Sequence, residues 1–80
     1  FNPETLIKLD IAQLTPSKIS IYDIRGREIK VLVDQELIPG YHQFIWNGTD
    51  AQGNSVGSGL YFIMVQTPKV TQTMKATLLR

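Results

Sequence analysis

The chain has 80 residues, enough for one small domain with a single core. Eight Lys and Arg residues against seven Asp and Glu give a net charge of +1, without the clustered basic excess of a nucleic-acid-binding protein. Cysteine is absent, which excludes disulfides and thiolate chemistry, and no apolar run approaches the ~20 residues of a membrane span.

Apolar residues in the first half recur with a period of two, which predicts strands with one buried face. This alternation runs through residues 7–11, 19–21 and 29–33. Arg25-Gly26 interrupts it between the second and third segments, and Gly26 can supply the positive φ of a tight turn. We therefore expect a strand followed by a hairpin.

In the second half, Pro39-Gly40 marks a turn before residues 41–46, where aromatic residues occur in both registers. Residues 60–66 form an apolar run of strand length, and residues 70–79 are rich in Thr and β-branched side chains. No useful window has helical periodicity. Six or seven short strands predict an all-β, immunoglobulin- or fibronectin type III-like antiparallel β-sandwich spanning residues 1–80.

The glycine-rich stretch WNGTDAQGNSVGSGLYF, residues 46–62, is the place to look for a binding loop. It lacks the pattern of a phosphate-binding loop, and no helix follows it. Asn47, Asp50, Gln52 and Asn54 offer oxygen ligands, but only Asp50 is charged. Asp50 is therefore only a weak candidate for a cation ligand, and no cofactor is expected.

A structural interpretation fits every residue of this stretch. Glycine and asparagine suit positive-φ turn positions, and the aspartate can accept backbone N–H groups two residues on. The Gly57-Ser58-Gly59 run lets the chain cross between sheets, while the tryptophan fills the core and the tyrosine ties down a corner. The residues expected to have structural roles are Trp46, Gly48, Asp50, Gly53, Gly59 and Tyr61.

The remaining residues do not form a pattern typical of an enzyme active site. His42 is the only histidine, and with no Cys and no neighbouring carboxylate in the sequence it has no partner for nucleophilic or metal chemistry. The carboxylates are scattered singly, and a small sandwich offers no deep cleft to desolvate a pair of them. We expect a domain that is not an enzyme.

Several motifs in order resemble one known family. They are Asn2-Pro3, Ile21-Tyr22-Asp23 with Gly26-Arg27-Glu28, Gly40-Tyr41-His42, Trp46-Asn47-Gly48-Thr49-Asp50 with Gly53-Asn54, Ser58-Gly59-Leu60-Tyr61-Phe62, and the basic terminus TMKATLLR. The chain resembles the type A C-terminal sorting domain of type IX secretion cargo, found on secreted proteins of Bacteroidetes. That family shares its sandwich with the immunoglobulin-like module of the flagellar hook-capping protein FlgD.

The resemblance implies a domain without chemistry of its own, at the C-terminal end of a larger secreted protein. It would reach the cell surface or the medium through the periplasm, recognised by outer-membrane secretion machinery and removed in many cases by a sortase-like protease. Because exposed strand edges can pair with a partner, the last strand is the expected recognition surface. Its expected contact residues are Lys75, Leu78, Leu79 and Arg80.

Two alternatives remain open. The first is a FlgD-like or fibronectin-like spacer that packs against a neighbouring catalytic domain, for which the parent gene would continue after Arg80. The second is a carbohydrate-binding module with Tyr41, Trp46 and Tyr61 as a stacking platform. Burial of Trp46 would argue against the second alternative.

Overall fold

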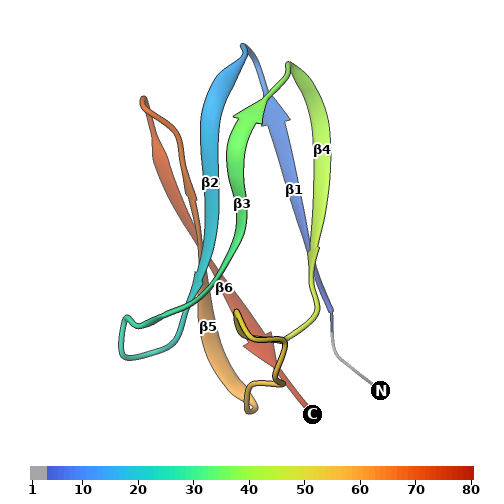
Figure 1. Cartoon of the computed structure of the whole chain (residues 1–80), viewed down its shortest axis with the longest axis vertical. Coiled ribbons are helices and arrows are strands. Elements are labelled where there is room, and N and C mark those ends of the chain that lie inside the picture. The colour runs from blue at the N-terminus through green and yellow to red at the C-terminus, as the bar shows by residue number, and fades with distance from the viewer. Residues whose placement is uncertain (1–3) are drawn as a thin grey trace.

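Residues 4–80 are described by a computed structural model, which contains six strands and no helix in that range (Figure 1). The Asn2-Pro3 pair lies outside the described residues. The strands are β1 (Thr5–Ile11), β2 (Thr15–Tyr22), β3 (Glu28–Leu37), β4 (Gly40–Trp46), β5 (Gly59–Gln66) and β6 (Thr71–Leu78). This range also contains no helix of the length and apolarity that a membrane crossing requires.

The six strands form two antiparallel sheets. One has the two strands β1 and β4, and the other has four strands in the order β3-β2-β5-β6. The chain therefore changes sheet after β1, after β3 and after β4, as Figure 1 shows. The expected immunoglobulin-like antiparallel sandwich is confirmed, with six strands.

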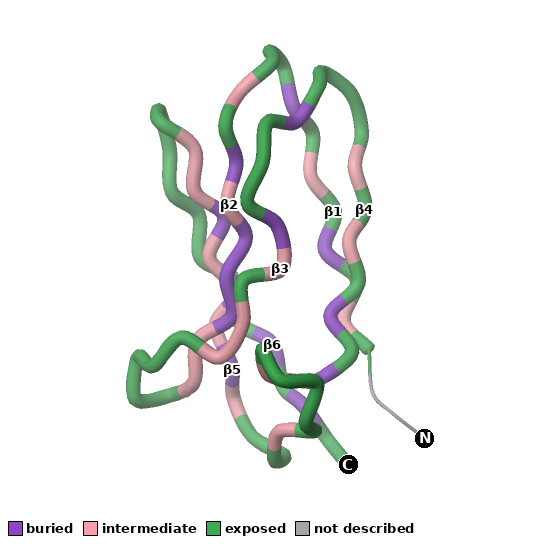
Figure 2. Tube along the Cα trace, viewed as in Figure 1, coloured by how far each residue is buried: buried purple, intermediate pink, exposed green. Residues whose placement is uncertain are grey.

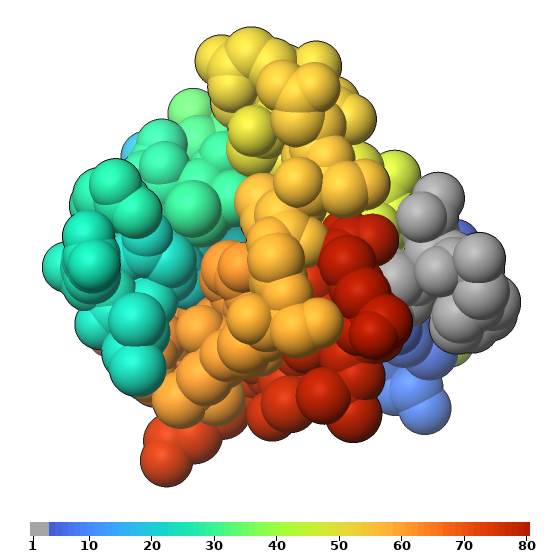
Figure 3. All heavy atoms as spheres, turned by 90° about the horizontal axis from the view of Figure 1, so that it is seen from below, coloured from blue at the N-terminus to red at the C-terminus, as the bar shows by residue number. Residues whose placement is uncertain are grey.

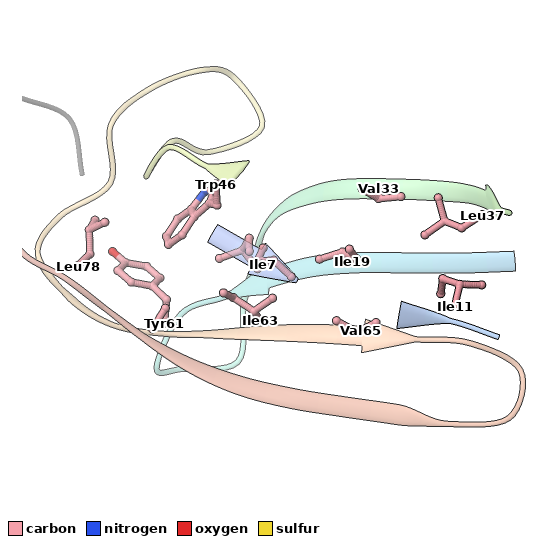
Figure 4. Close-up of a cluster of buried hydrophobic side chains, with 12 residues drawn as sticks. Ile7, Ile11, Ile19, Val33, Leu37, Trp46, Tyr61, Ile63, Val65 and Leu78 are labelled. Atoms are coloured by element: carbon pink, nitrogen blue, oxygen red, sulfur yellow. The ribbon is translucent and has the colours of Figure 1, made fainter. Parts of the chain in front are cut away.

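The core lies between the two sheets, because alternate side chains of each strand point inward. Ile7 and Ile11 of β1 face Ile19, Ile63 and other apolar residues of the four-stranded sheet (Figure 4). Buried residues accordingly recur at alternate positions along β5, and are separated by less buried ones along β1 (Figure 2). The buried apolar residues are Ile7, Ile11, Ile19, Ile21, Val33, Leu37, Trp46, Tyr61, Ile63, Val65, Ala76 and Leu78.

Several strand boundaries differ from the sequence-based expectation, and β2 in particular covers Thr15–Tyr22 where alternation marked only residues 19–21. β3 runs on from the expected residues 29–33 to cover Glu28–Leu37, and β6 is one residue shorter at each end than residues 70–79. The pairing of β2 with β3 contains two register shifts, so an extra residue of β3 is left unpaired at each bulge. The far end of β3 was missed because Asp34, Gln35 and Glu36 are polar and exposed, so the apolar alternation stops at Val33 although the strand continues to Leu37.

Candidate recognition surface

The glycine-rich stretch forms the connection between β4 and β5, which crosses from one sheet to the other. A small hairpin lies inside it: Thr49 and Ser55 form an antiparallel bridge, and the Asp50 N–H donates to the Asn54 carbonyl at 2.8 Å. Gly48 and Gly53 have φ values of +75° and +84°, the left-handed region that glycine adopts without strain. These two glycines set the turns of the hairpin.

The Asp50 carboxylate is used within this hairpin. Its Oδ1 accepts the backbone N–H of Gln52 at 3.0 Å and that of Asn54 at 2.9 Å, the aspartate turn foreseen from the sequence. Within residues 4–80, no group of three or more His, Cys, Asp or Glu side chains is arranged to hold a metal. In this conformation Asp50 shapes a turn.

Trp46 and Tyr61 anchor the two ends of the stretch inside the core. Their rings meet edge to face at 5.2 Å between centroids, with 64° between planes (Figure 4). The indole Nε1–H of Trp46 donates to the Thr49 carbonyl at 2.9 Å, and the Tyr61 hydroxyl donates to the Gly57 carbonyl at 2.7 Å. The indole nitrogen and the tyrosine hydroxyl thus each have a hydrogen-bond partner in the loop.

The expectation that Tyr41, Trp46 and Tyr61 form a stacking platform for carbohydrate is wrong, because two of the three rings are buried in this fold. Trp46 is fully buried and Tyr61 is 8% exposed, which leaves only Tyr41 on the surface, at 56% exposed. A sugar needs an accessible ring face for stacking, and two of the three rings offer none.

The C-terminal end of the chain packs on the same loop. The guanidinium of Arg80 donates from Nη2 to the Gly48 carbonyl at 2.6 Å and from Nε to the Val56 carbonyl. Its backbone N–H donates to the Ser58 hydroxyl at 3.0 Å. Figure 3 shows the end of the chain lying against the atoms of this loop. The end of β6 and the loop are therefore held together as one unit.

The four residues expected to contact a partner lie in different environments. Lys75 and Leu79 are on the surface, and Leu79 is 75% exposed. Leu78 is 2% exposed and belongs to the core, so no partner reaches its side chain while β6 stays in the sheet. Arg80 is exposed, but its guanidinium already donates hydrogen bonds to carbonyls of the loop. Of the four, Lys75 and Leu79 are accessible and uncommitted.

β6 is the last strand of its sheet and is paired only with β5 among the described strands. Its first five residues, 71–75, are exposed on both faces, whereas Ala76 and Leu78 are buried (Figure 2). The strand thus has an anchored end near the C-terminus and a free half, residues 71–75, whose side chains are all exposed. An exposed edge strand with unpaired backbone groups is a template for pairing with another chain.

His42 and Asp23, the most conspicuous ionisable residues elsewhere, are engaged locally. His42 Nε2 lies 2.8 Å from the Ile38 carbonyl, and its ring stacks on Phe44 with 6.1 Å between centroids. Asp23 accepts the backbone N–H groups of Arg27 and Arg25 and the Arg27 side chain, each at 2.9 Å. The Arg27 backbone N–H bond, above all, lowers the pKa of Asp23 below its ordinary value.

Sequence reasoning missed the bonds that Arg80 makes with the loop. Its partners Val56 and Gly48 lie 24 and 32 residues away, and no local pattern connects positions so distant. The one available signal was the basic residue at the end of the chain, which was assigned to a partner. A guanidinium has five N–H donors, and backbone carbonyls of the same chain can accept them.

Comparisons with known proteins agree with this geometry. The model of the FlgD Ig-like domain family matches residues 4–70, and the chain therefore belongs to that family. Its fold is similar to the crystal structure of FlgD from P. aeruginosa, with a TM-score of 0.70 and 21% sequence identity. The similarity covers 95% of this chain and 60% of that one, so this chain spans less than two thirds of its structural neighbour. No curated protein matches the sequence.

Proposed function

We propose that this FlgD Ig-like domain is a non-catalytic sorting domain, which directs a covalently attached cargo protein through the type IX secretion system to the cell surface. Its partners are the outer-membrane secretion machinery and a sortase-like protease, and the route passes through the periplasm. The motif resemblance supports the proposal across nearly the whole chain, and membership of the FlgD Ig-like family is consistent with it.

The exposed half of β6 is the single observation that carries the proposal. A recognition signal has to be readable on the folded surface, and residues 71–75 are open on both faces and along one edge. Leu79 adds an apolar side chain that is 75% exposed beside this strand. The buried Leu78 and the bound Arg80 supply the fixed end from which the readable half projects.

Export of the native cargo tests the proposal. Cargo lacking residues 70–80 is expected to remain in the periplasm, but this deletion also removes Ala76 and Leu78 from the core. A double surface substitution, Lys75→Glu with Leu79→Asp, leaves the core untouched and is expected to reduce export just as strongly. Glu36→Lys on β3 is the matched control, since it reverses an exposed charge on the opposite edge strand. Normal export of the cargo with the deletion and of the cargo with the double substitution would contradict the proposal.

A second candidate is a structural spacer, and the similarity to FlgD favours it. In that role the domain packs against a neighbouring domain of the parent protein. The β6 surface substitutions would then leave export unchanged, whereas removal of the entire domain would lower the melting temperature of its neighbour. The same set of cargo variants therefore separates the two functions.

A further inference from the structure

The two outer strands of the four-stranded sheet differ in how well their edges are protected. β3 has two register shifts and several charged residues, including Glu28, Asp34 and Glu36, which are devices that discourage edge-to-edge pairing. β6 pairs with β5 through eight consecutive residue pairs without a shift, and Lys75 is its only charged residue. One edge of this sheet is thus blocked and the other is open.

The closing turn of the β5–β6 hairpin fixes which backbone groups of β6 point outward. The Thr67 N–H donates to the Val70 carbonyl at 2.8 Å, so this pair is hydrogen-bonded within the hairpin. Hydrogen-bonded and non-bonded pairs alternate along an antiparallel ladder. The N–H and C=O groups that face away from β5 therefore belong to Thr71, Thr73, Lys75 and Thr77.

The side chains beside this open edge have a defined chemistry. Lys75 is paired across the ladder with half-buried Phe62, on the outer face of the sheet. No carboxylate among residues 4–80 lies within ion-pair distance of its ammonium group. On the opposite face, the Met74 side chain is 37% exposed. The edge thus presents an unmatched cation on one face and an apolar contact on the other.

We propose that the open edge of β6 binds an extended segment of its partner in which apolar residues alternate with polar ones and a carboxylate lies opposite Lys75. The added strand would pair with the outward backbone groups of Thr73 and Lys75 and place an apolar side chain beside Met74. The inference specifies the partner chemistry of the proposed sorting function and draws its biological meaning from that function. Binding itself can be measured without secretion.

A synthetic peptide serves as the probe. It has seven residues in which valine alternates with threonine, a glutamate replaces the central threonine, and a fluorescent label reports binding by anisotropy. The control peptide carries lysine in place of the glutamate. The intact chain is expected to bind the glutamate peptide roughly threefold or more tightly, the size of effect that an exposed ion pair gives. Equal binding of the two peptides would overturn the inference.

Two substitutions test the edge directly. Thr73→Pro removes an outward N–H but no bond to β5, and proline is tolerated at such edge positions, so we expect at least about tenfold weaker binding. Thr73→Val keeps that N–H and should bind as the unaltered chain does. Unchanged Trp46 emission verifies that each variant is folded. Equal peptide binding by the Pro and Val variants would overturn the inference.

Other outcomes separate the inference from the proposed function. Lys75→Glu should reverse the preference between the two peptides, and failure to do so contradicts the carboxylate partner. A concentration-dependent dimer that Thr73→Pro abolishes would show a second copy as the occupant, which also contradicts it. If the peptides bind as expected but the β6 substitutions leave export unchanged, the proposed sorting function is contradicted and the binding edge is supported. If export requires β6 but neither peptide binds, the inference alone falls.

Discussion

Arg80 and Gly48 form a close contact between the C-terminal end of the chain and the β4–β5 loop. The Arg80 Nη2 donates to the Gly48 carbonyl at 2.6 Å, and a Cβ added to Gly48 would lie 2.7 Å from the same Nη2. It would also lie 3.2 Å from Leu78 Cδ1. Gly48 is therefore constrained twice, by its positive φ and by the side chains packed on it.

A glycine-to-alanine series separates these two constraints. Gly57 has neither a positive φ nor a neighbour within 4 Å, Gly53 has φ of +84° with no neighbour, and Gly48 has both. We expect Gly57→Ala to be nearly neutral, Gly53→Ala to cost about 1 kcal/mol and Gly48→Ala about 3 kcal/mol of unfolding free energy. Urea denaturation followed by Trp46 fluorescence measures all three. Equal effects at Gly48 and Gly53 would contradict the packing described here.

The bonds of Arg80 should be measurable in the same way. Arg80→Ala removes its two side-chain contacts with the loop carbonyls but keeps the backbone bond to Ser58, and we expect a loss of about 1 kcal/mol. Arg25→Ala is the control, because Arg25 lies exposed in the β2–β3 turn and should change stability by less than about 0.5 kcal/mol. Faster amide hydrogen exchange in residues 47–58 should accompany Arg80→Ala only.

The hydroxyl of Tyr61 should stabilise the corner before β5. Tyr61→Phe removes its 2.7 Å bond to the Gly57 carbonyl while the ring stays in the core, and we expect a loss of about 1 kcal/mol. Tyr22→Phe loses only a 3.4 Å contact with Glu28 at the surface and should be close to neutral. Thermal unfolding of both variants checks this, and a larger effect at Tyr22 would refute it.

Asp23 should make the domain sensitive to acid. Its pKa in the folded state is lowered from 3.8, chiefly by the Arg27 backbone N–H bond, so the stability it adds is full above that value. This contribution is lost as the pH falls through the lowered folded-state pKa. As the pH falls below 3.8, the unfolding free energy of Asp23→Asn should therefore decrease less than that of the unaltered chain. Gln35→Asn, at an exposed position on β3, changes no ionisable group and should show the slope of the unaltered chain.

The sequence predicted the features of the fold that depend on local pattern. Alternation located β1 and β2, the Pro39-Gly40 turn located the start of β4, and the Tyr61 corner followed from its position just inside β5. The two bulges of β3 could not be foreseen, because they arise from how β3 pairs with β2 and leave no mark on either strand alone.

The exposure of the candidate recognition residues was predicted only in part, for a related reason. The sequence pointed to the last strand, but burial of Leu78 depends on the opposing sheet and on Gly48, 30 positions earlier in the chain. Likewise, the exposure of residues 71–75 depends on which part of β6 the rest of the fold covers. Both features are determined by tertiary packing, which cannot be inferred from the period-two alternation of apolar residues.

Transfer of residues 1–80 to an unrelated protein tests the central claim most directly. A periplasmic reporter enzyme with this chain fused at its C-terminus would be expressed in a bacterium that has type IX secretion. The reporter is expected at the cell surface or in the medium, and the Lys75→Glu, Leu79→Asp form of the fusion is expected to stay in the periplasm. Retention of the unaltered fusion in the periplasm, at the level of the reporter alone, would contradict the sorting function.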